Sequence, residues 1–231
     1  MTKVPKARLS PGLRVNPNRD SVKTPRKGLV MQILHPWTGS LQEYEQSLSD
    51  PDRYRPGHCP QCQAQQALIG HGFYVRTLVD CGWDGAIRVR RYLCRLCQRT
   101  VSLLPQFALP WLRFSVTVIS LFLVARLLQG LTLAAAAVAA QQPAMPYERG
   151  QFWIRRFRKQ APRLSLALAP LAAPAAAPDL VTRALHMLQS IGWIAAHRFL
   201  FSELRAHLLG WPGFLAPDGR RATLVPAGPS A

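Results

Sequence analysis

Acidic residues are scarce in this sequence of 231 residues. It contains 11 Asp and Glu against 29 Lys and Arg, which gives a formal net charge of +18 and a pI of about 11.1. Such an excess of positive charge is costly in a compact fold that has no polyanionic partner. The composition therefore predicts binding to nucleic acid or to an anionic membrane surface, whereas an acidic substrate would not need so large an excess of positive charge.

Cysteines and long apolar runs are also few. Five cysteines are too few for a disulfide-dense secreted scaffold, and the first residues lack the apolar core of a signal peptide. The most apolar stretch, residues 114–140, is interrupted by Arg126, Gln129 and Gly130, whereas a membrane span needs about 20 apolar residues. We therefore expect a reducing compartment and no membrane partner, as for a cytoplasmic, nucleoid-associated protein.

The strongest motif is a pair of CxxC turns, which begin at Cys59 and Cys94. Four thiolates complete a tetrahedral site of the kind that holds structural zinc. The residues between the turns alternate as a β-hairpin, whose two ends would bring the sulfurs together. A thioredoxin-like redox pair would need a βαβ context, and two disulfides would need an oxidising compartment. The sequence therefore predicts one structural Zn²⁺ with the ligands Cys59, Cys62, Cys94 and Cys97, and leaves Cys81 as a free thiol.

Arginines surround the second CxxC turn. Clustered guanidinium groups beside a rigid, metal-held hairpin suit contacts with phosphate, although a merely solvated basic face has the same composition. The predicted phosphate contacts are Arg88, Arg90, Arg91, Arg95 and Arg99.

Beyond Pro110 the apolar period becomes helical, with Ser115 and Thr132 as candidate N-caps. A further helix is expected over residues 147–160, with one aromatic face and one cationic face. Short helices in this order, the last one basic outside, are typical of a helix-turn-helix whose recognition helix enters the major groove. The predicted DNA contacts of this helix are Gln151, Arg155, Arg156, Arg158 and Lys159.

These patterns predict a small β zinc ribbon followed by an all-α helix-turn-helix bundle, with a disordered basic N-terminal arm and a frayed C-terminus. A final helical segment is expected to pack or to mediate self-association. The expected segments are a basic arm (1–28), a weakly structured lead-in (29–56), the zinc ribbon (57–105), the helix-turn-helix (111–160), an Ala- and Pro-rich linker (161–178), the C-terminal helical segment (179–210) and a tail (211–231).

The cysteine turns, together with residues 68–77, 89–97 and 99–105, resemble a bacterial family of unknown function that couples a zinc ribbon to a helix-turn-helix. That family is similar to the N-terminal DNA-binding modules of insertion-sequence transposases. The resemblance covers about residues 57–160 and implies DNA binding in a mobile-element or regulatory setting. Gln63 and Gln98 occupy positions after each CxxC turn where such zinc sites often have Gly. The left-handed backbone conformation expected there is energetically less favourable for Gln than for Gly.

Catalytic motifs were not found. None of the acidic residues lies on a convincing core strand, as a two-metal transposase site would need, and the sequence has no P-loop, nucleophile elbow or HExxH motif. We therefore expect a zinc-dependent DNA-binding protein, transposase-like or associated with a mobile element, that is not catalytic by itself. The alternatives are a transcriptional regulator with the same modules, or a zinc-stabilised module that binds protein or RNA.

Overall fold

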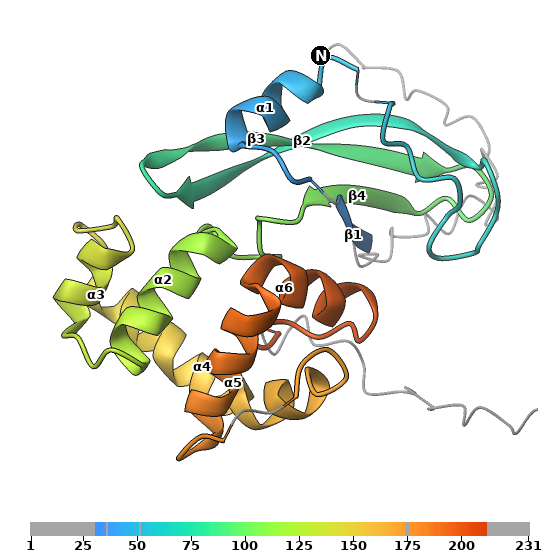
Figure 1. Ribbon diagram of the computed structural model, residues 1–231. Coiled ribbons are helices and arrows are strands. Elements are labelled where there is room, and N and C mark those ends of the chain that lie inside the picture. Colours follow the sequence, from blue (N-terminus) through green and yellow to red (C-terminus); the bar gives the residue numbers. More distant parts are fainter. Residues whose placement is uncertain (1–30, 36, 51, 174–175, 212–231) are drawn as a thin grey trace, which may run out of the picture.

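The computed structural model describes residues 31–35, 37–50, 52–173 and 176–211, and consists of one sheet followed by a group of helices (Figure 1). The sheet contains β1 (Met31–His35), β2 (Leu68–Asp80), β3 (Trp83–Cys94) and β4 (Thr100–Pro105) in the order β1-β4-β3-β2. β1 runs parallel to β4, and the other neighbours are antiparallel. The helices are α1 (Leu41–Ser47), α2 (Val116–Leu127), α3 (Leu133–Ala139), α4 (Tyr147–Ala167), α5 (Leu180–Ile191) and α6 (Trp193–Ser202).

β2 and β3 form a long hairpin that provides most of the sheet. Its register runs from Leu68 opposite Cys94 to Asp80 opposite Trp83, with an irregularity between Gly70 and Phe73. β4 pairs with β3 only over residues 90–93. The hairpin therefore extends beyond the rest of the sheet, and the edge of β3 is left open along its first half.

The short helix α1 covers part of this open edge. A capping box fixes its start, because Ser40 accepts the backbone N–H of Glu43 and the Glu43 carboxylate accepts the N–H of Ser40. At the β3 edge, the backbone N–H of Arg88 donates to the Glu45 carboxylate at 3.0 Å, and the Tyr44 hydroxyl donates to the carbonyl of Arg88 at 2.9 Å. Side chains of α1 thus replace the hydrogen bonds that a neighbouring strand would make.

The helices α2 to α6 gather on one side of the sheet and share a core (Figure 1). Its largest fully buried side chains are Trp153 of α4, Phe122 of α2 and Phe157 of α4. Trp153 packs edge-on against Phe122, with ring centroids 5.3 Å apart. Gly150 permits the close approach of α4 to α2, because a Cβ at this position would lie 2.6 Å from the Phe122 ring. Within the described residues, no helix is both long enough and apolar enough to cross a membrane.

The predicted fold class, a zinc ribbon followed by an all-α helix-turn-helix bundle, is wrong. The strands around the cysteines belong to a mixed four-stranded sheet over residues 31–105, and helices follow it. The sequence analysis missed β1, because five residues that pair with a strand about 70 positions later carry no local signal. Residues 29–56, expected to be weakly structured, contain both β1 and α1.

The helical region differs from a helix-turn-helix at α4. This helix continues through Pro162 to Ala167 instead of ending at Gln160, although an interior proline costs about 3 kcal/mol. Its second half buries Ala161 and Leu164 in the helical core, together with the C-cap Leu168, which offsets that cost. α4 is therefore a central helix of a larger cluster, and it is not the last helix of a three-helix reader.

The C-terminal helical segment packs against the other helices of the same chain. The apolar side chains of α5, including Leu185 and Leu188, are buried in the same core as α4. Self-association through this segment stays a prediction. The basic arm (1–28) and the tail beyond Trp211 lie outside the described residues.

Two histidines are buried where the last helical segment meets the chain before α2. Burial lowers the pKa of His197 on α6 to about 3, and it lowers the pKa of His207 to about 4. Nδ1 of His207 accepts the backbone N–H of Leu209 at 3.1 Å, and Nε2 lies 3.1 Å from the carbonyl of Pro110. With Nδ1 as an acceptor, Nε2 carries the proton of a neutral ring.

The fold should lose stability as the pH falls below about 6.5. Both histidines have a lower pKa in the folded state than in the unfolded state, so the unfolded chain takes up the protons first. Each histidine should lower the free energy of unfolding by about 1.4 kcal/mol per pH unit between its folded-state pKa and about 6.5. Urea unfolding at a series of pH values measures this slope. The substitution His207→Gln should make the slope shallower by one histidine's contribution, and an unchanged slope would contradict this assignment.

Candidate metal centre

Four cysteines converge at the end of the sheet where β2 begins and β3 ends. Cys59 and Cys62 lie in the segment before β2, Cys94 is the last residue of β3, and Cys97 lies in the turn toward β4. Their sulfur atoms all lie within 4.8 Å of one another. The closest pairs join one CxxC turn to the other, since Cys59 Sγ lies 3.7 Å from Cys97 Sγ and Cys62 Sγ lies 3.7 Å from Cys94 Sγ.

These separations fit metal coordination. Sulfurs about 2.3 Å from a tetrahedral metal ion are about 3.8 Å apart along each edge, close to the two shortest distances here. A disulfide needs sulfurs about 2.05 Å apart, and all the cysteines are free thiols in the structure. The four cysteines are therefore positioned to coordinate a metal ion, and a four-thiolate shell leaves no open position for a substrate.

The two CxxC turns have the same backbone design. The carbonyl of Cys59 accepts the N–H of Gln63 at 2.8 Å, and the carbonyl of Cys94 accepts the N–H of Gln98 at 3.0 Å. Both glutamines have left-handed backbone conformations, with φ of 60° and 54°. The sequence predicts an unfavourable left-handed turn at Gln63 and at Gln98, and the structure has a left-handed conformation at both positions.

The glutamine side chains support these turns. Gln98 Nε2 donates to the carbonyl of Arg95 at 2.7 Å, and Gln63 Nε2 donates to the carbonyl of Pro60 at 3.4 Å. Each side chain thus bonds a carbonyl three residues earlier in its own turn. This local hydrogen bond is one that glycine could not make, and it offsets part of the cost of the left-handed conformation.

Backbone N–H groups favour the thiolate form at one ligand. The N–H of Cys97, followed by that of Leu96, lowers the pKa of the Cys94 thiol to about 7. Desolvation raises the pKa of the Cys97 thiol to about 12. Four thiolates this close together repel one another, so a bound cation is needed to hold all of them deprotonated.

Cys81 lies at the opposite end of the hairpin and takes no part in the cluster. It is half-buried against the helical core, and burial raises the pKa of its thiol. This position fits a structural thiol without a metal role.

Three of the arginines predicted to contact DNA form ion pairs or hydrogen bonds with other residues of the protein. Arg90 is only 12% exposed; it bonds Asp52 at 2.9 Å and lies over the rings of Phe73 and Tyr92. Arg88 pairs with Glu45 at 3.4 Å. Arg156 donates to the carbonyls of residues 209–211 and so ties α4 to the end of the described chain. These side chains have structural roles that the sequence alone did not indicate.

The other residues predicted to contact DNA differ in the solvent exposure of their side chains. Gln151 is half-buried and bonds the Tyr147 hydroxyl at 2.8 Å. Arg91 is half-buried beside a cavity, and its Nε is buried without a hydrogen-bond partner among the described residues. The remaining side chains are exposed, and in the described part of the chain none forms an ion pair: Arg95, Arg99, Arg155, Arg158 and Lys159.

The cavity beside Arg91 was not predicted from the sequence. Arg76, from the same hairpin, and Trp111, from the loop before α2, also line it. Because these residues come from separate elements, only the folded arrangement brings them together.

Comparison with known proteins gives a partial match. The model of a family described as a domain of unknown function (DUF6431) matches residues 59–141. The matched part contains all four clustered cysteines and the chain from β2 to α3. No curated protein and no solved structure matches the chain. Residues 59–141 are thus similar to a domain family whose function is not known, and the comparisons offer no support for a transposase-like module.

The metal site should be essential for this end of the sheet. We expect the purified chain to contain about one tightly bound metal ion, and Cys94→Ser to lose most of it together with the thermal stability that the metal provides. Metal analysis by mass spectrometry and thermal unfolding measure the two effects. Cys81→Ser is the matched control and should retain the metal. Equal metal content in the two variants would contradict the assignment of the ligands.

Proposed function

We propose that the chain binds double-stranded DNA through exposed cationic side chains on a scaffold that contains one structural Zn²⁺. The observation that carries the proposal is the outer face of α4, on which Arg155, Arg158 and Lys159 are all exposed. Among the described residues, none of the three has a carboxylate within ion-pair distance. Exposed guanidinium and ammonium groups on one surface suit phosphate contacts, and Arg158 also interacts electrostatically with Asp179.

The inner face of α4 supports this role by fixing the helix. Trp153, Ile154 and Phe157 are buried in the helical core, so the cationic side chains extend from a rigid element. A rigid helix presents its charges to the DNA backbone with little loss of conformational freedom on binding. The proposal concerns phosphate contacts by this face and does not require a recognition helix in the major groove.

Arg95 and Arg99 form a second exposed cationic position beside the metal cluster. A zinc ion with four thiolates carries two net negative charges, and nearby arginines compensate that charge. We therefore assign the principal DNA contact to α4 and a supporting one to the arginines beside the cysteines.

Zinc is the proposed metal because a closed set of four thiolates is typical of structural zinc sites. The metal would stabilise the fold and would not act on a substrate. In this proposal the chain has no catalytic activity of its own. Its setting would be a mobile element or a regulated promoter: terminal inverted repeats beside the gene favour the first, and a cognate operator found by sequence selection favours the second.

Binding to duplex DNA should fall steeply with salt and depend on α4. We expect Arg155→Ala combined with Arg158→Ala to weaken binding and to reduce the slope of log K against log salt by about 2, because two phosphate contacts are lost. Fluorescence anisotropy with a labelled duplex measures both quantities.

The control is Arg53→Ala combined with Arg55→Ala, which removes the same formal charge from the segment before the cysteines, where Arg55 is paired with Asp52. This control should retain nearly all of the affinity. Equal losses in the two double variants, or binding that is indifferent to salt, would overturn the role of α4. Tighter binding to a matched RNA than to DNA would replace the proposal with an RNA-binding module.

A further inference from the structure

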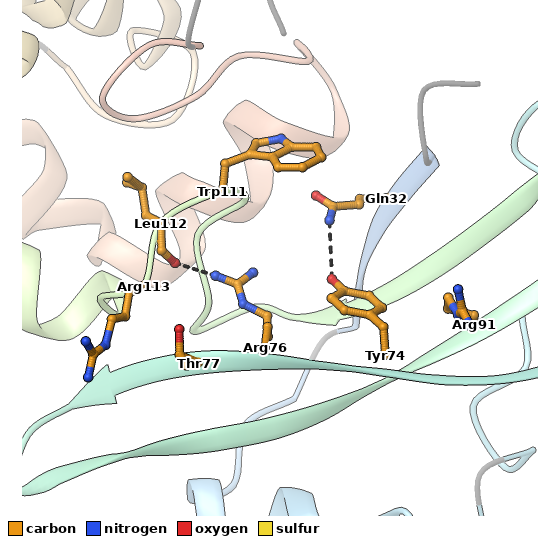
Figure 2. A pocket seen from close by; sticks show the side chains of 8 residues that line it. All are labelled: Gln32, Tyr74, Arg76, Thr77, Arg91, Trp111, Leu112 and Arg113. Atoms are coloured by element: carbon orange, nitrogen blue, oxygen red, sulfur yellow. Dashed lines mark hydrogen bonds between the residues drawn. The ribbon is translucent and has the colours of Figure 1, made fainter. Parts of the chain in front are cut away.

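A cavity of about 440 Å³ lies between the sheet and the loop that leads to α2. Figure 2 shows Tyr74, Arg76 and Arg91 on the side of the strands, and Trp111 on the side of the loop. Gln32 of β1 closes the space next to Tyr74, with its Nε2 3.4 Å from the Tyr74 hydroxyl. The volume falls in the range of about 300–1,000 Å³ that is typical of small-molecule sites.

The lining of this cavity is cationic. Its charged side chains are Arg76, Arg91 and Arg113, and none of the described residues that line it is acidic. Arg113 is paired with Asp84. Arg76 donates to the carbonyls of Leu109 and Leu112, and no carboxylate among the described residues pairs with it.

Arg91 is the least satisfied of these groups. Its Nε is buried without a hydrogen-bond partner, and no carboxylate among the described residues pairs with its guanidinium. The Arg91 side chain is half-buried, and its unpaired Nε would gain a hydrogen-bond partner if an anion entered the cavity. The cavity therefore has the electrostatics of an anion site.

Trp111 adds a second chemical feature. Its side chain is 49% exposed, and none of the aromatic rings described packs against it. Its backbone has φ of 64°, a left-handed conformation that bulky residues rarely adopt. This conformation holds a large flat ring at the mouth of a cationic cavity, where a planar ligand could stack on it.

We propose that this cavity binds a single nucleotide unit, with its phosphate against Arg91 and its base against the indole of Trp111. A phosphate alone would leave the indole unused, and a neutral aromatic ring would leave the guanidinium groups uncompensated. The site goes beyond the proposed DNA contact, because the bases of an intact duplex are stacked and do not reach such a cavity. The nucleotide is either free or an unpaired residue of a strand.

The first test is calorimetric titration of the full metal-containing chain with nucleoside 5′-monophosphates. We expect binding that is clearly tighter than that of the matching nucleoside or of inorganic phosphate. Trp111→Ala should weaken nucleotide binding about 5- to 150-fold, the effect of losing one base–aromatic stack, and Trp111→Phe should restore much of it. Inorganic phosphate that binds as tightly as the nucleotide, or no effect of Trp111→Ala, would overturn the proposal.

Arg91→Gln tests the phosphate contact, with Arg198→Gln as a control that removes the same charge from an exposed position on α6 outside the cavity. Arg91→Gln should lose nucleotide affinity while its metal content and thermal unfolding show that it is folded, and Arg198→Gln should not. Equal losses would overturn the assignment.

A short single strand and a duplex of the same sequence identify the source of the nucleotide. Tighter binding of the single strand than of the monophosphate, lost in Trp111→Ala, assigns the cavity to an unpaired residue of a strand. Tighter binding of the monophosphate assigns it to a free nucleotide. Duplex affinity that depends on Arg155 and Arg158 but not on Trp111 separates this site from the proposed DNA contact, so that either can fail alone.

Discussion

The convergence of four sulfur atoms is the constraint on which the rest of this structure depends. It joins the segment before β2 to the turn after β3, at the open end of a hairpin whose other end is closed by a tight turn. The apolar cluster around the cysteines is small, with Leu68, Tyr92 and Val101 among its buried members. Such a cluster alone provides little stability, so metal coordination would hold this end of the hairpin in register.

The cavity and the outer face of α4, the two proposed binding surfaces, depend on the four clustered cysteines to different degrees. Arg91 lies on β3 three residues before Cys94, and Gln32 and Arg91 both lie opposite Ser102 across the sheet. Fraying of the metal end would therefore disturb the cavity directly. α4 belongs to the helical core, which packs around Trp153 and Phe157 without any contribution from the four clustered cysteines. The charged face of α4 thus depends on helix packing, whereas the cavity would depend on a metal ion bound by the four cysteines.

Features that depend on residues close together in the sequence could be predicted. Features that depend on pairing between distant residues could not. The CxxC spacing indicated the cysteine cluster, and the alternation between the two turns indicated the hairpin of β2 and β3. β1 was missed because its partner is distant in sequence. Residues 161–167, expected to begin a linker, continue α4, because burial of Ala161 and Leu164 outweighs the helix-breaking effect of Pro162. Structural arginines could not be separated from free ones, because their partners, such as Asp52 for Arg90, are defined only by the fold.

X-ray absorption at the metal edge of the purified full chain tests the central claim most directly, because it counts the sulfur neighbours of the bound ion. The proposed zinc site predicts a zinc edge with about four sulfur scatterers at about 2.3 Å and no nitrogen or oxygen neighbour. A shell with two or fewer sulfurs, or one dominated by nitrogen or oxygen ligands, would contradict it.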